Sequence, residues 1–388
     1  MKITTIIGAR PQFIKAAAVS RAIAARKNEG QRPFFPSTAI EEILIHTGQH
    51  YDDEMSAIFF RELEIPEPRY NLNIGSGSHG HQTGEMLAAI EDVLLTEKPD
   101  WVLIYGDTNS TLAGALAAAK LHIPIAHVEA GLRSFNRRMP EEINRIVADQ
   151  LSSLLLCPSQ VAVDNLAVEG IGEMRENGGG GVSRFFPAEG IGKKVVITGD
   201  VMADALKFAA DRVETKSDIL ARLGLQPQGY LLATVHRAEN TDDSARLSHI
   251  LSAFAAIGEP VVFPVHPRTL KLLQASAYHP PAHVKLIAPL GYFDIIALEK
   301  NARLILTDSG GMQKEAYWLG VPCITLREET EWVETVTSGW NVLTGADRDR
   351  IVAAVRSFQP PSAHPPLYGD GQAAEKIVHM LSGKGERP

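Results

Sequence analysis

The chain has 388 residues, of which 45% are hydrophobic and 22% charged, and its formal net charge is −8. At roughly 150 residues per domain this length predicts two to three domains, and the composition excludes a disulfide-stapled miniprotein, a coiled coil and a disordered chain. The negative charge argues against a general nucleic-acid surface, because phosphate binding needs an excess of Lys and Arg. No apolar run approaches the ~20 residues of a membrane span, so we expect a cytoplasmic protein that does not contact a membrane.

Short apolar runs alternate with helical patterns along the chain, which predicts parallel sheets covered by helices on both faces. The first series of predicted strands comprises 3–7, 43–47, 101–105, 123–128, 153–157 and 194–198, and the second comprises 230–235, 260–265, 284–288, 303–307 and 321–326. Each series is sufficient for a doubly wound sheet. The predicted fold is therefore α/β, with two Rossmann-like domains that face a cleft. Cys157 and Cys323 fall in these runs, and we expect buried core residues rather than a disulfide.

A segment with four consecutive glycines and no periodicity, residues 175–193, separates the two series. We therefore predict an N-terminal domain at 1–193 and a C-terminal domain at 194–365. A helical pattern within 366–388 predicts a last helix that crosses back to cover the first domain. Such folds bind ligands at the carboxyl ends of their strands, so polar residues at those positions are the candidates for a site.

The first predicted strand ends in a glycine turn, GARPQFIK, which starts at Gly8 and has Pro11 near the first position of the next helix. Backbone N–H groups at the start of a helix attract anions, and Arg10 and Lys15 flank this turn. We expect an anion site here. The alternative is a routine strand-to-helix turn with two solvated cations.

Three acidic residues lie where strands end or helices begin in the predicted first domain. Asp107 and Glu129 each follow an apolar strand, and Glu141 follows Pro140 at a helix start. Carboxylates among apolar neighbours have raised pKa values and share proton-transfer roles, so these three are candidate acids and bases. The alternative makes Asp107 a helix cap and Glu141 a first-turn residue that only stabilises the helix dipole.

The predicted second domain carries polar residues at the same kind of position. His236 and His266 each follow an apolar strand, which is more typical of a site than of a core. The segment TDSGGMQKE then forms a strand-to-helix turn whose backbone amides suit a diphosphate, while Glu315 can accept hydrogen bonds from two ribose hydroxyls. The predicted diphosphate ligands are Ser309, Gly310 and Gly311.

No motif for a cofactor or a metal supports another chemistry. The chain lacks a G-x-G-x-x-G after its first strand, a P-loop motif and an H-E-x-x-H sequence. His46 and His50 are spaced like ligands on one helix face, but they follow a strand through a turn at Gly48. We therefore predict neither a cofactor nor a metal site.

Eight motifs follow one another along the chain: GARPQFIK, HTGQHYD, YGDTNSTLAG, HVEAGLR, PEEINR, HRAEN, VHP and TDSGGMQKEA. Through them the sequence resembles the non-hydrolysing UDP-N-acetylglucosamine 2-epimerase family. The resemblance implies a fold of the glycosyltransferase-B type, with UDP on the C-terminal domain and the sugar in the cleft, and a homodimer without a cofactor. It implies acid/base roles for Asp107, Glu129, Glu141 and His236. It also implies substrate contacts for Arg10, Lys15, Arg145, His266, Ser309, Gly310 and Glu315.

Two segments depart from the common pattern of that family. Trp332 stands where many members have an Arg, and the loop before Glu141 carries the dibasic pair Arg137-Arg138. In this short dibasic loop the sequence resembles the branch that acts on UDP-2,3-diacetamido-2,3-dideoxy-glucuronate, which implies 2-epimerisation by elimination and re-addition of UDP. A guanidinium can bind the C6 carboxylate of that sugar through two parallel hydrogen bonds. Alternatively, the two arginines pair with Glu141, Glu142 or solvent and the substrate is UDP-N-acetylglucosamine. A glycosyltransferase of the same fold and a non-catalytic sugar-nucleotide sensor are the other hypotheses.

Overall fold

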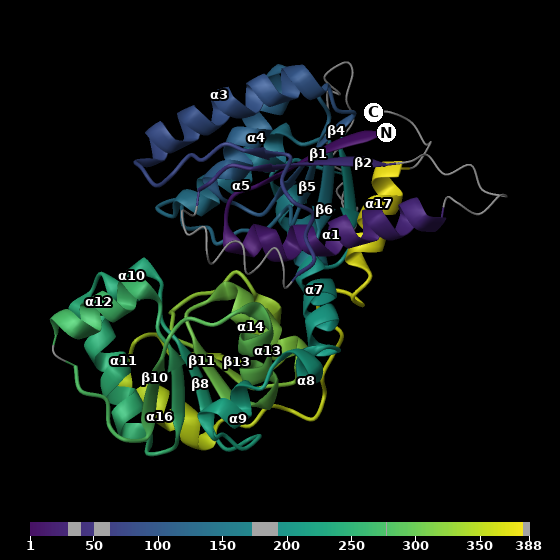
Figure 1. Cartoon of the computed structure of the whole chain (residues 1–388). Coiled ribbons are helices and arrows are strands. Elements are labelled where there is room, and N and C mark those ends of the chain that lie inside the picture. Colours follow the sequence, from purple (N-terminus) through teal and green to yellow (C-terminus); the bar gives the residue numbers. More distant parts are fainter. Residues whose placement is uncertain (30–39, 50–62, 173–192, 277, 383–388) are drawn as a thin grey trace, which may run out of the picture. The chain divides into compact units, whose positions relative to one another are not determined.

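The computed structural model describes residues 1–29, 40–49, 63–172, 193–276 and 278–382 (Figure 1). The chain divides into two compact units, of which the first comprises Met1–Ala205 with Tyr368–Pro388 and the second Leu206–Leu367. The division therefore falls after residue 205 and not at the predicted boundary of 193/194. The reason is that the strand after the glycine-rich segment, β7 (Lys194–Ile197), pairs with the first sheet. Residues 175–192 of the glycine-rich segment lie outside the described residues.

The first unit contains a seven-stranded parallel sheet of order β3-β2-β1-β4-β5-β6-β7. The chain runs outward from β1 to one side and then to the other, which is the doubly wound arrangement expected from the all-apolar strands. The sequence pattern did not reveal β3, because two residues are too short to show alternation. The other strands are β1 (Lys2–Ile7), β2 (Glu41–His46), β3 (Tyr70–Asn71), β4 (Trp101–Tyr105), β5 (Ile125–Val128) and β6 (Leu154–Cys157).

The helices of the first unit cover its sheet, and those that matter for the site are α1 (Arg10–Glu29), α4 (Asn109–Lys120) and α5 (Pro140–Leu151). Small residues of α4, such as Ala113 and Ala117, pack against Ile6 and Ile104 of the sheet in one buried cluster. The remaining helices are α3 (His79–Glu97), α6 (Gln160–Val168) and α7 (Val201–Ala210), the last of which continues past the division between the units.

The C-terminal helix α17 (Ala373–Ser382) belongs to the first unit and lies beside α1 (Figure 1). The Arg26 guanidinium donates to the carbonyl of Val378 at 3.3 Å. Asp204 accepts hydrogen bonds from the backbone N–H groups of Ala373 and Ala374, at 3.2 and 2.9 Å. Burial raises the pKa of Asp204 to about 6 although these two N–H groups lower it. The start of α17 is thus fixed by a carboxyl group that titrates near neutrality.

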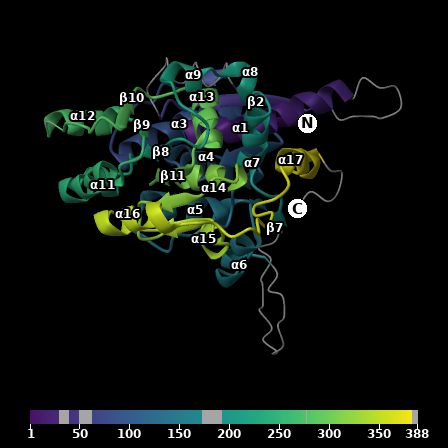
Figure 2. The ribbon, with the colours of Figure 1, turned by 90° about the horizontal axis from the view of Figure 1, so that it is seen from below.

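The second unit contains a six-stranded parallel sheet of order β10-β9-β8-β11-β12-β13. The helices α11 (Ser244–Ile257) and α16 (Arg348–Ser357) lie side by side (Figure 2), and both pack on one face of this sheet through Phe254 and Ile351. The strands are β8 (Leu231–Thr234), β9 (Val261–Pro264), β10 (Val284–Ile287), β11 (Leu304–Thr307), β12 (Cys323–Thr325) and β13 (Asn341–Leu343). The other helices are α8 (Val213–Lys216), α9 (Ile219–Leu223), α10 (Ala238–Thr241), α12 (Pro267–Ala275), α13 (Tyr292–Asn301), α14 (Gly310–Trp318) and α15 (Val333–Thr337).

Both cysteines are buried and free, as the apolar runs around them predict. Among the described helices, none has the length and apolar character needed to cross a membrane.

Candidate active site

The loops that follow β1, β4 and β5 meet at one edge of the first sheet, because these strands are parallel neighbours. Tyr105 at the end of β4 is in register with Val128 at the end of β5. Asp107 and Glu129 therefore come just after two paired strand ends, as the sequence pattern predicts. This edge is the usual ligand-binding edge of a doubly wound sheet.

Glu129 has an unusual backbone conformation and a buried side chain. Its φ of 72° is left-handed, which costs a non-glycine residue on the order of 1–3 kcal/mol and persists only where the surroundings enforce it. Here the N–H groups of Glu129 and Ala130 both donate to the carbonyl of Leu156, at 3.0 and 3.2 Å. The carboxylate of Glu129 forms an ion pair with the ammonium of Lys15, and both side chains are almost fully buried. Glu129 is thus neither a helix cap nor a solvated surface group.

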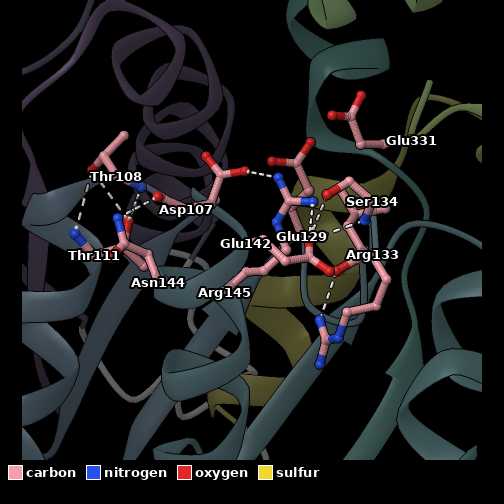
Figure 3. Close-up of polar contacts among 12 residues, drawn as sticks. Asp107, Thr108, Thr111, Glu129, Arg133, Ser134, Glu142, Asn144, Arg145 and Glu331 are labelled. Carbon is pink, nitrogen blue, oxygen red and sulfur yellow. Dashed lines mark hydrogen bonds and ion pairs between the residues drawn. The ribbon is translucent and has the colours of Figure 1, made fainter. Parts of the chain in front are cut away.

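Asp107 does not cap the helix that follows it. Thr108 is the N-cap of α4, and its hydroxyl accepts a hydrogen bond from the N–H of Thr111. The carboxylate of Asp107 pairs instead with Arg145 of α5, while Asn144 donates to its carbonyl at 2.9 Å (Figure 3). The first turns of α5 therefore hold Asp107 in place through both its side chain and its main chain.

The neighbouring residues Glu141 and Glu142 have opposite environments in the first turn of α5. Glu142 is buried and accepts from Arg145 and from the N–H and hydroxyl of Ser134, each at 3.0 Å, and from the N–H of Phe135 at 2.9 Å (Figure 3). Glu141 is half-buried, and its side chain makes no hydrogen bond or ion pair with any other described residue. Glu142 thus anchors the loop before α5, whereas the carboxylate of Glu141 is free to act on a ligand.

The glycine turn after β1 differs from the expected anion site. The amide oxygen of Gln12 accepts from the N–H groups of Gly8 and Ala9, at 2.8 and 3.1 Å, so these amides are not free as we expected. A Cβ at Gly8 would lie 2.0 Å from the hydroxyl oxygen of Thr47, which explains the glycine by close packing. Of the two predicted cations, Lys15 pairs with Glu129, and the side chain of Arg10 lies outside what the structure describes.

In the second unit, the buried carboxylate of Asp308 organises the turn after β8. It accepts from the N–H groups of His236, at 3.0 and 3.1 Å to its two oxygens, and of Arg237, at 3.0 Å. The exposed ring of His236 lies near that of His266, with 6.3 Å between ring centroids. The two predicted histidines therefore come together at the carboxyl edge of the second sheet.

The start of α14 has the geometry of an N-terminal helix turn. Ser309 is the N-cap and accepts from the N–H of Met312, while Gly310 is the first helical residue and Gly311 follows, half-buried. A Cβ at Gly310 would lie 3.1 Å from the indole nitrogen of Trp332, so glycine is needed for close approach. Glu315, one turn further along α14, is buried.

Trp332, the residue that departs from the family pattern, packs on a cation. The ammonium of the buried Lys314 lies 3.5 Å from the centroid of the Trp332 ring, which is a close cation–π contact. The indole therefore contacts both the first residue of α14 and a lysine within that helix.

Arg137 and Arg138, in the loop between Glu129 and α5, are exposed. Neither the Arg137 nor the Arg138 side chain forms an ion pair with Glu141 or Glu142 within the described part of the chain. Of the alternative partners, the structure thus contains solvent, to which both arginines are exposed, and not Glu141 or Glu142. Phe135, at the start of the loop, is 77% exposed and has a left-handed φ of 59°.

Sequence reasoning missed several polar residues in or behind the site: Gln12, Asn144, His127, which contacts the carbonyl of Gly106, and Asp149, which contacts both His127 and Arg133. A signal existed for His127, because a lone histidine inside the apolar strand IAHV needs a buried partner. Gln12 and Asn144 gave no signal, since a single amide in a helix has no distinctive spacing. His50, the second histidine of the disfavoured metal pair, lies outside the described residues.

Two parallel doubly wound sheets with polar residues at their carboxyl edges define a two-domain α/β protein of the glycosyltransferase-B type. A family model described as UDP-N-acetylglucosamine 2-epimerase matches residues 36–382, and the chain belongs to this family of UDP-sugar 2-epimerases, which are isomerases. It is 53% identical to a UDP-N-acetylglucosamine 2-epimerase homolog of Methanococcus maripaludis, over 98% of this chain and 99% of the relative.

Two further relatives bear on the substrate. A UDP-2,3-diacetamido-2,3-dideoxy-D-glucuronate 2-epimerase of Pseudomonas aeruginosa is 50% identical over 98% of this chain and 99% of its own. The crystal structure of Methanocaldococcus jannaschii UDP-GlcNAc 2-epimerase, in complex with UDP-GlcNAc and UDP, is 42% identical, with a TM-score of 0.85 and coverage of 98% and 99%.

Proposed function

We propose that this enzyme epimerises C2 of UDP-2,3-diacetamido-2,3-dideoxy-glucuronate, by elimination and re-addition of UDP. The observation that carries the choice of substrate is the exposed pair Arg137 and Arg138, which has no carboxylate partner in the described part of the chain and sits in the loop anchored by Glu142. The 50% identity to a relative with that activity supports the same substrate.

The chemistry follows from the position of the C2 hydrogen. It is next to an amide nitrogen and not a carbonyl, so simple deprotonation would leave an unstabilised carbanion. In an elimination, a base takes the proton from C2, and the electron pair of the C2–H bond forms the C1–C2 double bond. The electron pair of the C1–O bond leaves with UDP. Re-addition of UDP at C1, with protonation of C2 from the other face, completes the epimerisation. The route needs a base, an acid and donors for the leaving diphosphate.

The first unit supplies the proton-transfer groups in this proposal. Glu129 and Asp107 lie at one sheet edge, each oriented by a cation, and Glu141 offers a carboxylate without a partner among the described residues. The second unit supplies diphosphate donors through Ser309 and Gly310 at the start of α14, where backbone N–H groups and the helix dipole favour an anion. His236 is a further acid/base group, His266 contributes a further donor, and Glu315 binds the ribose.

The proposed uronate preference rests on the shape of the guanidinium group. Arg137 or Arg138 can bind the C6 carboxylate through two parallel charged hydrogen bonds, whereas the C6 hydroxyl of UDP-N-acetylglucosamine offers no such match. Glu142 holds the start of the loop through hydrogen bonds from Ser134 and Phe135, so the segment that precedes the two arginines is fixed in place.

The test compares kcat/KM for the two UDP-sugars in the wild type and in Arg137→Ala and Arg138→Ala. We expect the wild type to prefer the uronate, and at least one variant to lose about tenfold or more on the uronate alone, as expected for a lost charged hydrogen bond. Arg356→Ala removes an exposed arginine of α16 and serves as the control. Equal or better wild-type turnover of UDP-N-acetylglucosamine would identify a general 2-epimerase and leave the dibasic loop without a substrate role.

The elimination itself is tested by running the reaction in D2O and observing C2 by proton NMR. The product should gain deuterium at C2, since the proton is exchanged with solvent. Inversion with full retention of the original hydrogen would refute the mechanism. Release of UDP only when an acceptor is present would indicate a glycosyltransferase instead.

A further inference from the structure

A buried histidine links α5 to the loop that carries Asp107. His127 of β5 is completely buried, and its Nδ1 lies 2.7 Å from a carboxylate oxygen of Asp149, which is also completely buried. Its Nε2 lies 2.7 Å from the carbonyl oxygen of Gly106. The mechanism above uses neither His127 nor Asp149.

Both ring nitrogens of His127 face groups that can only accept. Burial raises the pKa of Asp149, but the hydrogen bond and charge of His127, together with Arg133, outweigh it and lower the pKa overall. Asp149 also accepts from the Arg133 guanidinium at 2.8 Å and from the N–H of Gly131 at 3.1 Å. The carbonyl of Gly106 can only accept, so this contact requires a hydrogen on Nε2 of His127.

The carbonyl that His127 holds belongs to a critical turn. Gly106 has a left-handed φ of 58°, and its N–H donates to the carbonyl of Val128 at 3.0 Å. A Cβ at Gly106 would lie 3.1 Å from Nζ of Lys15 and 3.2 Å from a carboxylate oxygen of Glu129. The next residue is Asp107. Gly106 therefore lies close to the Lys15–Glu129 pair, and the peptide that follows it leads directly to Asp107.

We propose that His127, held by Asp149, is a positioning residue for the epimerase reaction. Its Nε2–H fixes the peptide between Gly106 and Asp107, and this peptide in turn fixes the Asp107 carboxylate beside Arg145. His127 does not touch the substrate in this proposal. The inference rests on the proposed role of Asp107 in proton transfer.

Two isosteric variants separate the bond to Gly106 from the bond to Asp149. The amide nitrogen of glutamine reaches about as far as Nε2, so His127→Gln keeps a donor for Gly106 and loses the one for Asp149. The amide nitrogen of asparagine reaches about as far as Nδ1, so His127→Asn does the reverse. We expect His127→Asn to lower kcat about 10²-fold with KM little changed, because a small misplacement of a reacting group has this effect, and His127→Gln to recover most of that loss.

His283→Gln is the matched control. The ring nitrogen of His283 lies 3.1 Å from the carbonyl oxygen of Phe254, before β10 in the second unit, so the variant changes a comparable histidine-to-carbonyl contact outside the site. Its kcat should equal that of the wild type. If His127→Gln proves worse than His127→Asn, the ion pair with Asp149 matters and the proposed control of Gly106 is wrong.

Asp107→Asn distinguishes a failure of this inference from a failure of the proposed function. Normal turnover in that variant would remove Asp107 from catalysis, and the positioning proposal would fall with it. Impaired Asp107→Asn together with normal His127→Asn would overturn the positioning proposal alone. Proton–nitrogen NMR of the wild type labelled with [15N]histidine, with the His127 signal identified by its loss in His127→Gln, should show a proton on Nε2 of His127. A bare Nε2 on His127 would also overturn the proposal.

Discussion

The adjacent residues Glu141 and Glu142 should respond in opposite ways to the same substitution. In Glu142→Gln, an amide nitrogen replaces one of two oxygens that together accept from Ser134, Phe135 and Arg145. If the glutamine keeps its oxygen toward Ser134 and Arg145, its NH2 group faces the N–H of Phe135. That N–H is then a buried donor without an acceptor, which lowers the unfolding free energy by about 1–3 kcal/mol. The lost charge beside buried Arg145 adds a similar amount, so the total loss of unfolding free energy is about 3–5 kcal/mol.

Glu141→Gln changes a half-buried carboxylate that has no partner in the described structure, so its unfolding free energy should stay within about 0.5 kcal/mol of the wild type. Its kcat should fall by about 10²–10⁴-fold if Glu141 transfers a proton. Urea unfolding and turnover, measured on both variants, give the four values needed. A Glu142→Gln protein as stable as the wild type would contradict the anchoring role of Glu142, and full turnover in Glu141→Gln would reduce Glu141 to a first-turn residue.

Three further predictions concern other parts of the molecule. Asp107→Asn and Glu129→Gln should each lower turnover about 10²–10⁴-fold while UDP affinity, measured by calorimetry, stays unchanged. Gly310→Ala should weaken UDP binding about tenfold because the new methyl presses on an indole, whereas Gly311→Ala, with no atom nearer than 3.9 Å, should bind normally. Because the pKa of Asp204 is raised to about 6, its contribution to the unfolding free energy should fall by roughly 2.4 kcal/mol from pH 4 to pH 7, and Asp204→Asn should abolish this dependence.

Burial on both faces made most of the fold predictable from sequence. Strands such as WVLIY and LILT are apolar throughout, so their positions and the polar residues at their ends, including Asp107 and Glu129, could be identified without a structure. The short strands β3 and β13 gave too few residues for a pattern. The boundary between the units was placed too early because a glycine-rich segment marks an interruption in the chain, and it does not tell which sheet the next strand joins.

The partners of the site residues were harder to predict than the residues themselves. The spacing of GARPQFIK indicated backbone N–H groups that are free to bind an anion, but the side chain of Gln12 accepts their hydrogen bonds. Sequence spacing cannot show which acceptor in the folded protein pairs with the N–H groups of a turn. Likewise PEEINR offered two adjacent carboxylates of equal chemistry. Only the fold decides that Glu142 accepts from Arg145 and from the loop amides of Ser134 and Phe135, because the path of that loop is not encoded in the spacing of the motif.

The backbone strain at Glu129 gives a physical reason for the composition of the strand end HVE. Side chains two residues apart on a regular strand share one face, so His127 and Glu129 would contact the same helix. In the structure His127 contacts Asp149 of α5, whereas Glu129 contacts Lys15 of α1. The left-handed φ at Glu129 ends the alternation and allows one short strand to serve both helices. A glycine would adopt this conformation without strain, so the stability of the turn alone would favour glycine at this position. The presence of a glutamate is therefore explained by its carboxylate.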